Sequence, residues 1–323
     1  MINQLLRFTP ILKQKIWGGK KLNQLLHKSS DGSNIGESWE ISDVDGDESI
    51  VSSGNFAGRT LRSLLKEYKH DLVGDYVYNT FGKQFPLLIK FIDAKEVLSI
   101  QVHPDDDLAG LQKSFGKTEM WYVVQADEEA SIIIGFKEDS NKEEYIKHLK
   151  SKSLLDILNI DEVKKGDVYF VPPGRVHAIG AGLLIAEIQQ TSDLTYRIYD
   201  WDRKDIDGNY RELHTEKALK AISFSAENSY KTTYLKQENV ANQVVTCPYF
   251  TTNILPVKGK KAIDLSKKDS FIIYMCVEGE VMFFHKNQQE IVRKGETILV
   301  PACIDKVEIL SENSSELLET YIK

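Results

Sequence analysis

Apolar and polar positions alternate over short stretches along most of the chain, which predicts a mainly β protein. The run 86–94 is almost continuously apolar and predicts a buried strand. Shorter strand-like runs follow at 98–102, 119–124 and 131–135. From Tyr230 onward the chain is nearly all short strand-like runs separated by turns. We therefore expect β-sheets to form the framework of the molecule.

Helical spacing of apolar residues occurs in a few segments between these strands. Thr60 is placed as an N-cap, and the residues after it predict one helix over 60–80, or two helices broken near Gly74. The segment 138–160 predicts one or two amphipathic helices, and 211–226 predicts a further helix. The fold class is therefore mainly β with some α.

An internal repeat indicates how the strands are arranged. The segments KGDVYFVP (165–172) and KGETILVP (294–301) share a glycine–acid turn, four strand residues and a proline. This pattern is typical of a cupin-type jelly roll, so we expect two cupin-type jelly-roll β-barrels, the first with helical additions. In this register His177 aligns with Lys306, so the second copy keeps the strand and lacks the histidine.

The chain of 323 residues is long enough for two domains. We expect a catalytic domain with helical segments over 1–235. A degenerate C-terminal β domain without metal ligands is expected over 236–323. The boundary is placed between a helix ending near Asn228 and a strand near Val244.

Composition excludes several classes of partner. The net charge of −7 argues against a general nucleic-acid binder. No apolar run approaches the ~20 residues of a membrane span, and the N-terminal residues do not resemble a secretory signal. The three cysteines form no CxxC pair, which fits a reducing compartment. We expect a cytoplasmic protein that acts on a small molecule; the sequence indicates no oligomeric state.

Side chains suited to metal binding lie near the ends of the predicted strands. Gln101 and His103 are two residues apart, so a strand places both on one face. Glu119 opens the next strand, and His177 follows the turn of the repeat. Each histidine alone also fits an ordinary turn or strand residue, but the four together suit Zn²⁺ with one open position. Fe²⁺, Mn²⁺ or Co²⁺ could use the same donors.

Charged residues close to this set point to an anionic substrate. Lys117 precedes Glu119 by two positions, and Arg197 lies in a strand-like run where an inward-pointing arginine needs an anion. Arg203 is a second candidate, although an ordinary surface ion pair explains it equally well. Glu187, together with Asp193, is a candidate general acid or base.

The segments that carry these residues resemble type I phosphomannose isomerases in their short bacterial form. The matching motifs are QVHP (101–104), GKTE (116–119), PGRVHA (173–178) and the stretch 187–203. The resemblance covers the first two-thirds of the chain, and the long helical insertion of longer family members is not present. It implies the following roles: one zinc ion held by Gln101, His103, Glu119 and His177; a catalytic Arg197; a pocket lined by Lys117 and Glu187; and substrate binding by Arg203.

The reaction implied by the resemblance interconverts D-mannose 6-phosphate and D-fructose 6-phosphate through an enediolate. The proton-transfer group is either Glu187 or a water on the metal, and Arg197 contacts either the phosphate or the enediolate. Two alternatives belong to other functional classes: a non-catalytic cupin module that binds a sugar phosphate, and an Fe²⁺ cupin dioxygenase. Glu119 and Gln101 beside two histidines match the facial triad of such oxygenases imperfectly.

Overall fold

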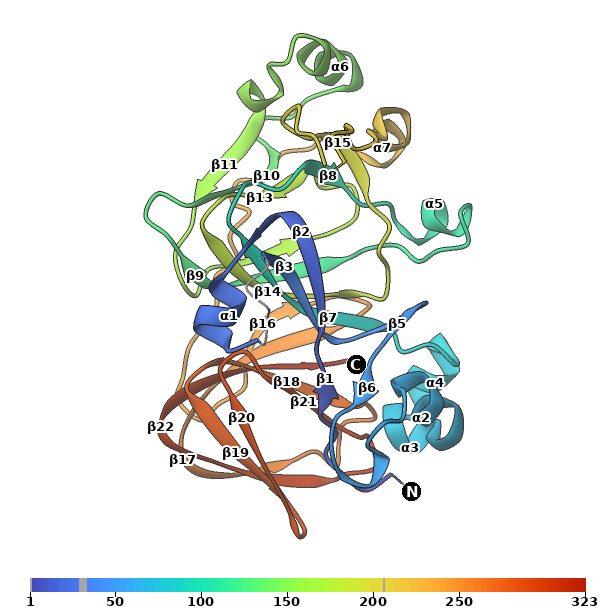
Figure 1. Ribbon diagram of the computed structural model, residues 1–323, viewed down its shortest axis with the longest axis vertical. Helices are drawn as coiled ribbons and strands as arrows, with labels where there is room; N and C mark the ends of the chain where they lie inside the picture. The colour runs from blue at the N-terminus through green and yellow to red at the C-terminus, as the bar shows by residue number, and fades with distance from the viewer. Residues whose placement is uncertain (1, 29–33, 206) are drawn as a thin grey trace.

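A computed structural model gives the fold of the chain and describes residues 2–28, 34–205 and 207–323. The molecule is elongated, with two β-sheet bodies stacked along its long axis (Figure 1). The first body contains a five-stranded and a six-stranded sheet, and the second contains a seven-stranded sheet. The pairings between these strands are antiparallel, and strands predominate over short helices, which confirms the mainly β class. In spatial order, the five-stranded sheet consists of β11 (Leu158–Glu162), β10 (Ser131–Phe136), β13 (His177–Ile179), β8 (Ile100–Val102) and β15 (Tyr196–Tyr199). The six-stranded sheet consists of β12 (Val168–Val171), β9 (Glu119–Ala126), β14 (Leu183–Gln190), β7 (Leu87–Ala94), β2 (Ile11–Gly19) and β3 (Ile35–Ile41). The seven-stranded sheet consists of β16 (Asn242–Thr246), β17 (Thr251–Asp264), β22 (Lys306–Tyr321), β18 (Ile272–Glu278) and β21 (Thr297–Val300), with β19 (Glu280–His285) and β20 (Gln288–Arg293) beside β22.

The repeated motifs occupy equivalent places in the two bodies. The first becomes β12, at one edge of the six-stranded sheet, and the second becomes β21, at one edge of the seven-stranded sheet. Each strand ends where a proline follows, because proline has no N–H to continue the ladder. Among the described residues the ladders form open sheets rather than closed rings, so the structure confirms the β framework and not the expected closed barrels.

Short helices lie around these sheets, and their bounds correct three expectations. The segment 60–80 forms three helices, with Thr60 accepting the Ser63 N–H as the predicted N-cap. The segment 138–160 contains one α-helix and a short 3₁₀ helix at Leu154–Asp156, and the helical structure stops there because Leu158 begins β11 and pairs with β10. The helix expected over 211–226 is limited to Thr215–Ala221. The helices are α1 (Lys21–Leu26), α2 (Leu61–Tyr68), α3 (His70–Val73), α4 (Asp75–Phe81), α5 (Asp106–Gly110), α6 (Lys142–Lys150) and α7 (Thr215–Ala221).

Layers of apolar side chains separate the sheets. The inner faces of the five-stranded and six-stranded sheets share one cluster, which includes Trp121, Ile134 and Ile185. The outer face of the five-stranded sheet packs against residues of α6 and α7, among them Tyr145 and Ala218. Helices α6 and α7 therefore lie at the end of the molecule farthest from the C-terminal sheet (Figure 1).

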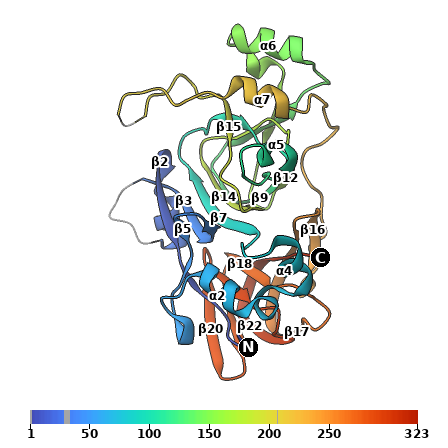
Figure 2. The same cartoon turned by 90° about the vertical axis from the view of Figure 1, so that its right-hand side faces the viewer.

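The two bodies share a core. The outer face of the six-stranded sheet and helices α2–α4 contribute to the same buried cluster as the C-terminal sheet. The rings of Phe85 and Phe271 lie 4.5 Å apart across this contact. Figure 2 shows α2 and α4 lying over the C-terminal sheet. A further cluster, which includes Phe283 and Val292, lies on the other side of that sheet.

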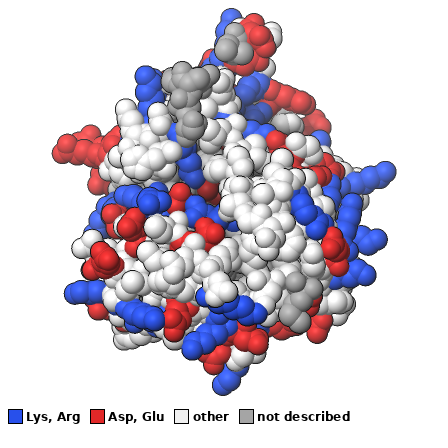
Figure 3. Space-filling model, turned by 60° about the horizontal axis from the view of Figure 1, so that its bottom comes forward, with Lys and Arg blue, Asp and Glu red and all other residues white. Residues whose placement is uncertain are grey.

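The outside of the molecule carries both signs of charge. On the face shown in Figure 3, acidic and basic side chains are interspersed. Among the described residues, no helix has the length and apolar character that crossing a membrane requires.

Candidate metal centre

The five-stranded sheet brings three distant residues into one row. His177 on β13 pairs with Gln101 on β8, and Gln101 pairs with Arg197 on β15. Residues directly opposite each other in a ladder project to the same face. Their neighbours Ala178, Val102 and Ile198 belong to the outer core, so the three polar side chains face the space between the two sheets.

The six-stranded sheet faces this row with carboxylates. Glu187 on β14 pairs with Trp121 on β9 and with Lys90 on β7. Glu119 lies two residues before Trp121 and therefore shares its face. His103 follows β8 directly. The two sheets thus direct acids and imidazoles into one buried space, as the sequence predicts for Glu119, Glu187 and His177.

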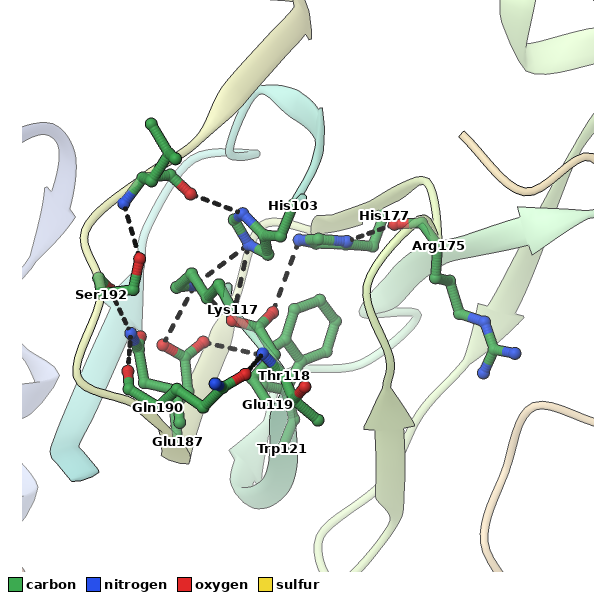
Figure 4. Close-up of polar contacts among 12 residues, drawn as sticks. His103, Lys117, Thr118, Glu119, Trp121, Arg175, His177, Glu187, Gln190 and Ser192 are labelled. Carbon is green, nitrogen blue, oxygen red and sulfur yellow. Dashed lines mark hydrogen bonds and ion pairs between the residues drawn. The ribbon is translucent and has the colours of Figure 1, made fainter. Parts of the chain in front are cut away.

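His103, Glu119 and His177 form a compact group that could hold a metal ion, and all three are buried. Their ligand atoms all lie within 4.8 Å of one another. His103 Nε2 lies 3.5 Å from Glu119 Oε2, and His177 Nε2 lies 3.4 Å from Glu119 Oε1. The imidazole centroids are 4.7 Å apart. The close-up in Figure 4 shows both rings on one side of the Glu119 carboxylate.

Backbone carbonyls fix the orientation of both imidazoles. His103 Nδ1 lies 3.2 Å from the Leu194 carbonyl, and His177 Nδ1 lies 2.8 Å from the Arg175 carbonyl. A carbonyl can only accept, so each Nδ1 carries the proton and each Nε2 presents its lone pair towards Glu119. This second contact is typical of histidines that bind metals.

Burial keeps both rings neutral. Desolvation lowers the pKa of His103 well below its usual value, and the nearby Lys117 adds to the effect. Burial also lowers the pKa of His177, to about 3. Metal ligands must be unprotonated, so these imidazoles are in the required form at neutral pH.

Lys117 reaches the centre of the group. Its ammonium lies 3.0 Å from His103 Nε2 and makes a short ion pair with Glu119. Burial, followed by repulsion from Glu187, raises the pKa of Glu119 to about 7 even with this cation beside it. The ammonium is thus a stand-in cation that contacts two of the three donors a divalent ion would use.

A divalent metal fits the residues present. Glu119 Oε1 and His177 Nε2 are buried without a hydrogen-bond partner, although such atoms are normally satisfied. Metal bonds of about 2.1 Å place neighbouring tetrahedral ligand atoms about 3.4 Å apart, which is close to the 3.5 and 3.4 Å between each imidazole Nε2 and its nearer Glu119 oxygen. The half-buried Gln101 lies next to His177 in the ladder.

Glu187 lies beside this group in an ion-paired setting. Its carboxylate contacts Lys90 Nζ at 2.9 Å, Lys117 Nζ at 3.9 Å and the Trp121 indole N–H at 2.7 Å. Burial alone would raise the pKa of Glu187, but Lys90 and Lys117 outweigh it and lower the pKa to about 2. Glu187 is therefore ionised at neutral pH.

Lys90 is the residue of this site that our sequence analysis missed. It is buried in the middle of β7, and attraction to Glu187 and Glu37 overcomes its desolvation and raises its pKa. The sequence feature that could have revealed Lys90 is that it is the single lysine inside the apolar run 86–94, because a buried cation needs a partner.

Arg197 lies on β15, and Arg203 follows that strand. Arg197 is half-buried, donates to the Glu212 carbonyl at 2.9 Å and leaves its buried Nε without a partner. Arg203 donates to the Val97 carbonyl at 2.6 Å and to Asp200 at 2.7 Å. Arg203 and Asp200 do form an ion pair, but their side chains are only 17% and 6% exposed, so it is not the ordinary surface pair that the sequence left open as an alternative.

Comparison with known proteins agrees with this geometry. Residues 5–138 match the model of the phosphomannose isomerase type I catalytic domain, and residues 240–317 match the mannose-6-phosphate isomerase cupin domain. The chain is 34% identical to mannose-6-phosphate isomerase ManA of Bacillus subtilis over 305 residues, 93% of this chain and 94% of that protein. It is also 34% identical to mannose-6-phosphate isomerase of Streptococcus mutans, over 94% of this chain and 96% of that protein.

Solved structures show the same relationship. The crystal structure of mannose 6-phosphate isomerase from Bacillus subtilis superposes with a TM-score of 0.89 at 33% identity, over 98% of this chain and 99% of that one. Both the sequence and the fold are therefore matched along nearly the whole length. The chain belongs to the type I phosphomannose isomerase family.

Proposed function

We propose that this protein is a zinc-dependent aldose–ketose isomerase that interconverts D-mannose 6-phosphate and D-fructose 6-phosphate through an enediolate. The observation that carries the proposal is the buried His103–Glu119–His177 group, with two neutral imidazoles and two orphaned donor atoms, next to the ionised Glu187. Membership of the family supplies the substrate class.

The metal would be held by His103, Glu119 and His177, with Gln101 as a fourth ligand. Nitrogen and oxygen donors at these separations suit Zn²⁺, which has no redox chemistry and so fits a reaction without net oxidation. When bound, a divalent ion supplies a fixed positive charge that stabilises negative charge developing on the sugar oxygens.

The chain's own residues account for the proton transfer. Moving a carbonyl from C1 to C2 requires removal of a proton from C2 and its delivery to C1, while the hydroxyl proton on O2 moves to O1. Glu187 is the proposed acceptor, because it is buried beside the metal ligands and ionised at neutral pH. A group held at so low a pKa is a weak base, so the proposal requires its contacts with Lys90 and Lys117 to lengthen when the sugar phosphate is bound.

Cationic residues would hold the anionic parts of the substrate. Lys117 is the cation nearest the ligands and is placed to face a developing oxyanion. We propose Arg197 as the catalytic-site arginine, supported by its free Nε and its place in the ladder beside Gln101. Arg203, with its own Nε unpartnered, is proposed as a second substrate contact at this end of the sheet.

The proposal includes the division of the chain into two domains. We propose that 1–235 form the catalytic domain and 236–323 a degenerate cupin domain, each built as a jelly roll. Two facing sheets with a common core in the first part, and a seven-stranded sheet with an apolar cluster of its own in the second, support this reading. A cytoplasmic location is also proposed, supported by the three cysteines, which are all free thiols.

The test is conversion of mannose 6-phosphate to fructose 6-phosphate by the purified protein, before and after chelation and after zinc is added back. We expect activity that chelation removes and zinc restores. Binding of the sugar phosphate without turnover would favour the alternative of a non-catalytic cupin module.

A further inference from the structure

A single turn, residues 172–176, contacts both histidine ligands through its backbone. The Gly174 N–H donates to the His103 carbonyl at 2.9 Å. The Arg175 carbonyl accepts from His177 Nδ1 at 2.8 Å. The turn therefore ties the residue after β8 to the start of β13, and any shift of the turn moves both imidazoles. We call residues 172–176 the ligand turn.

The Arg175 side chain extends away from the histidines and anchors the ligand turn on its outer side. Figure 4 shows the Arg175 carbonyl facing His177 and the guanidinium pointing the other way. The guanidinium donates to the Phe170 carbonyl at 3.0 Å, makes a short ion pair with Glu227 and lies 4.9 Å from the centre of the Tyr230 ring. Only 11% of the side chain is exposed.

Glu227 and Tyr230 belong to a segment that is itself well fixed. This segment, residues 223–232, is called the strap. It binds the ligand turn directly, because Ser223 N–H donates to the Gly174 carbonyl at 2.9 Å. Tyr230 OH contacts the Phe136 N–H at 3.1 Å and the Phe136 carbonyl at 2.9 Å, so the strap is tied to β10 as well.

We infer that Arg175 is a positioning residue that couples the strap to both histidines of the metal centre. Its guanidinium holds the ligand turn against the strap, and its carbonyl holds His177 in the tautomer that leaves Nε2 free. This role rests on the metal centre of the proposed function and deepens it. Residues that orient metal ligands typically change metal affinity 10- to 100-fold when they are lost.

The test measures the zinc dissociation constant by competition with a chelator, in wild type and in Arg175→Gln. Arg7→Gln is the matched control. Arg7 has the same pair of contacts, a backbone carbonyl (Ile291, 2.7 Å) and a glutamate (Glu296, 3.1 Å), but neither contact leads to a histidine. Thermal unfolding of each metal-free variant measures the change in stability separately from metal affinity.

We expect Arg175→Gln to weaken zinc binding about tenfold, while Arg7→Gln leaves it within about twofold at a similar loss of stability. The ¹⁵N resonance of His177 Nδ1 should shift in Arg175→Gln and not in Arg7→Gln. Equal zinc affinity in wild type and Arg175→Gln, or equal weakening in the two variants, would overturn the inference.

Two further measurements separate a failure of the variant to fold from a failure of the inference. If Arg175→Gln does not fold, Arg175→Lys keeps the charge beside Glu227 without spanning Phe170 and Glu227 together. It should still bind zinc more weakly than Arg7→Lys, and equal affinities would refute the role. A wild-type protein that binds no zinc would instead contradict the proposed function, so the two failures are distinguishable.

Discussion

In the metal centre, neighbouring groups determine the protonation state of individual side chains. His103 and His177 are kept neutral by burial and by carbonyls at Nδ1, whereas Glu187 is kept ionised by two lysines. The grouping of the two histidines with Glu119 could be predicted from the sequence, because ligand-type residues at strand ends are unusual, whereas the ligand role of Gln101 stays a prediction. Lys90 could not be assigned a role, because only the ladder shows that it lies opposite Glu187.

Replacing Lys90 tests the electrostatics of Glu187. In Lys90→Met, the largest opposing charge is removed and only Lys117 and the Trp121 indole N–H still oppose burial, so the folded-state pKa of Glu187 should rise from its lowered value. Leaving a buried charge unpaired costs about 3–5 kcal/mol, so we expect a loss of that size in the free energy of unfolding at neutral pH.

The direction in which stability changes with pH follows from the difference between the pKa of Glu187 in the folded and in the unfolded protein. In wild type the pKa of Glu187 is lowered, so its stabilising contribution is present above pH 4.5 and is lost as pH falls towards 2. In the variant the lowering by Lys90 is gone, so less stability is lost between pH 4.5 and 2 and the difference between the two proteins should narrow in that range. Urea unfolding of both proteins at neutral pH and at acidic pH within this range measures this, and a difference that does not change with pH would contradict it.

At the scale of elements, the ligand turn depends on a glycine. Gly174 has a φ of +84°, and a Cβ there would lie 2.7 Å from the Ala221 carbonyl oxygen. Gly46 has a φ of +83° with nothing within 4 Å of the added atom, which makes it a matched control. The two positions therefore share the backbone strain and differ in the clash.

We expect Gly46→Ala to cost about 1–2 kcal/mol, the strain of a left-handed residue with a side chain. Gly174→Ala should cost more and should also weaken zinc binding, because the ligand turn has to move. Urea unfolding and zinc titration of both variants give the comparison. Similar stabilities in the two variants would show that the ligand turn is not closely packed.

The observed boundaries of strands and helices show where the spacing of apolar residues was sufficient to predict secondary structure. The strand predicted over 86–94 is β7, and the helix predicted after Thr60 is present because its N-cap and apolar face agree. The helix predicted through Leu158 is wrong beyond α6 and a short 3₁₀ turn, because pairing with β10 outweighs the helical spacing of a few leucines.

At the scale of the whole molecule, the shared core between the two bodies could not be predicted. The sequence indicates that β7, β9 and β14 are apolar on both faces, but not what covers the second face. The structure shows that this face packs in one cluster with the C-terminal sheet. The second body therefore supports the sheet that carries Glu119 and Glu187.

This arrangement predicts that the two bodies unfold together. The four tryptophans all precede residue 202, so their fluorescence reports on the first body alone. Phe283 lies in the cluster on the far side of the C-terminal sheet, and Phe283→Ala should cost about 3–5 kcal/mol. We expect the tryptophan transition in urea to shift by that amount together with the circular-dichroism signal. An unchanged tryptophan transition would mean that the bodies unfold independently.

The most direct test of the account is the metal stoichiometry of the purified chain, measured by zinc titration of the metal-free protein and of His177→Ala. The account predicts one tightly bound zinc per chain in wild type, and loss of that site in the variant while the fold remains intact. One equivalent bound by His177→Ala with wild-type affinity would contradict it.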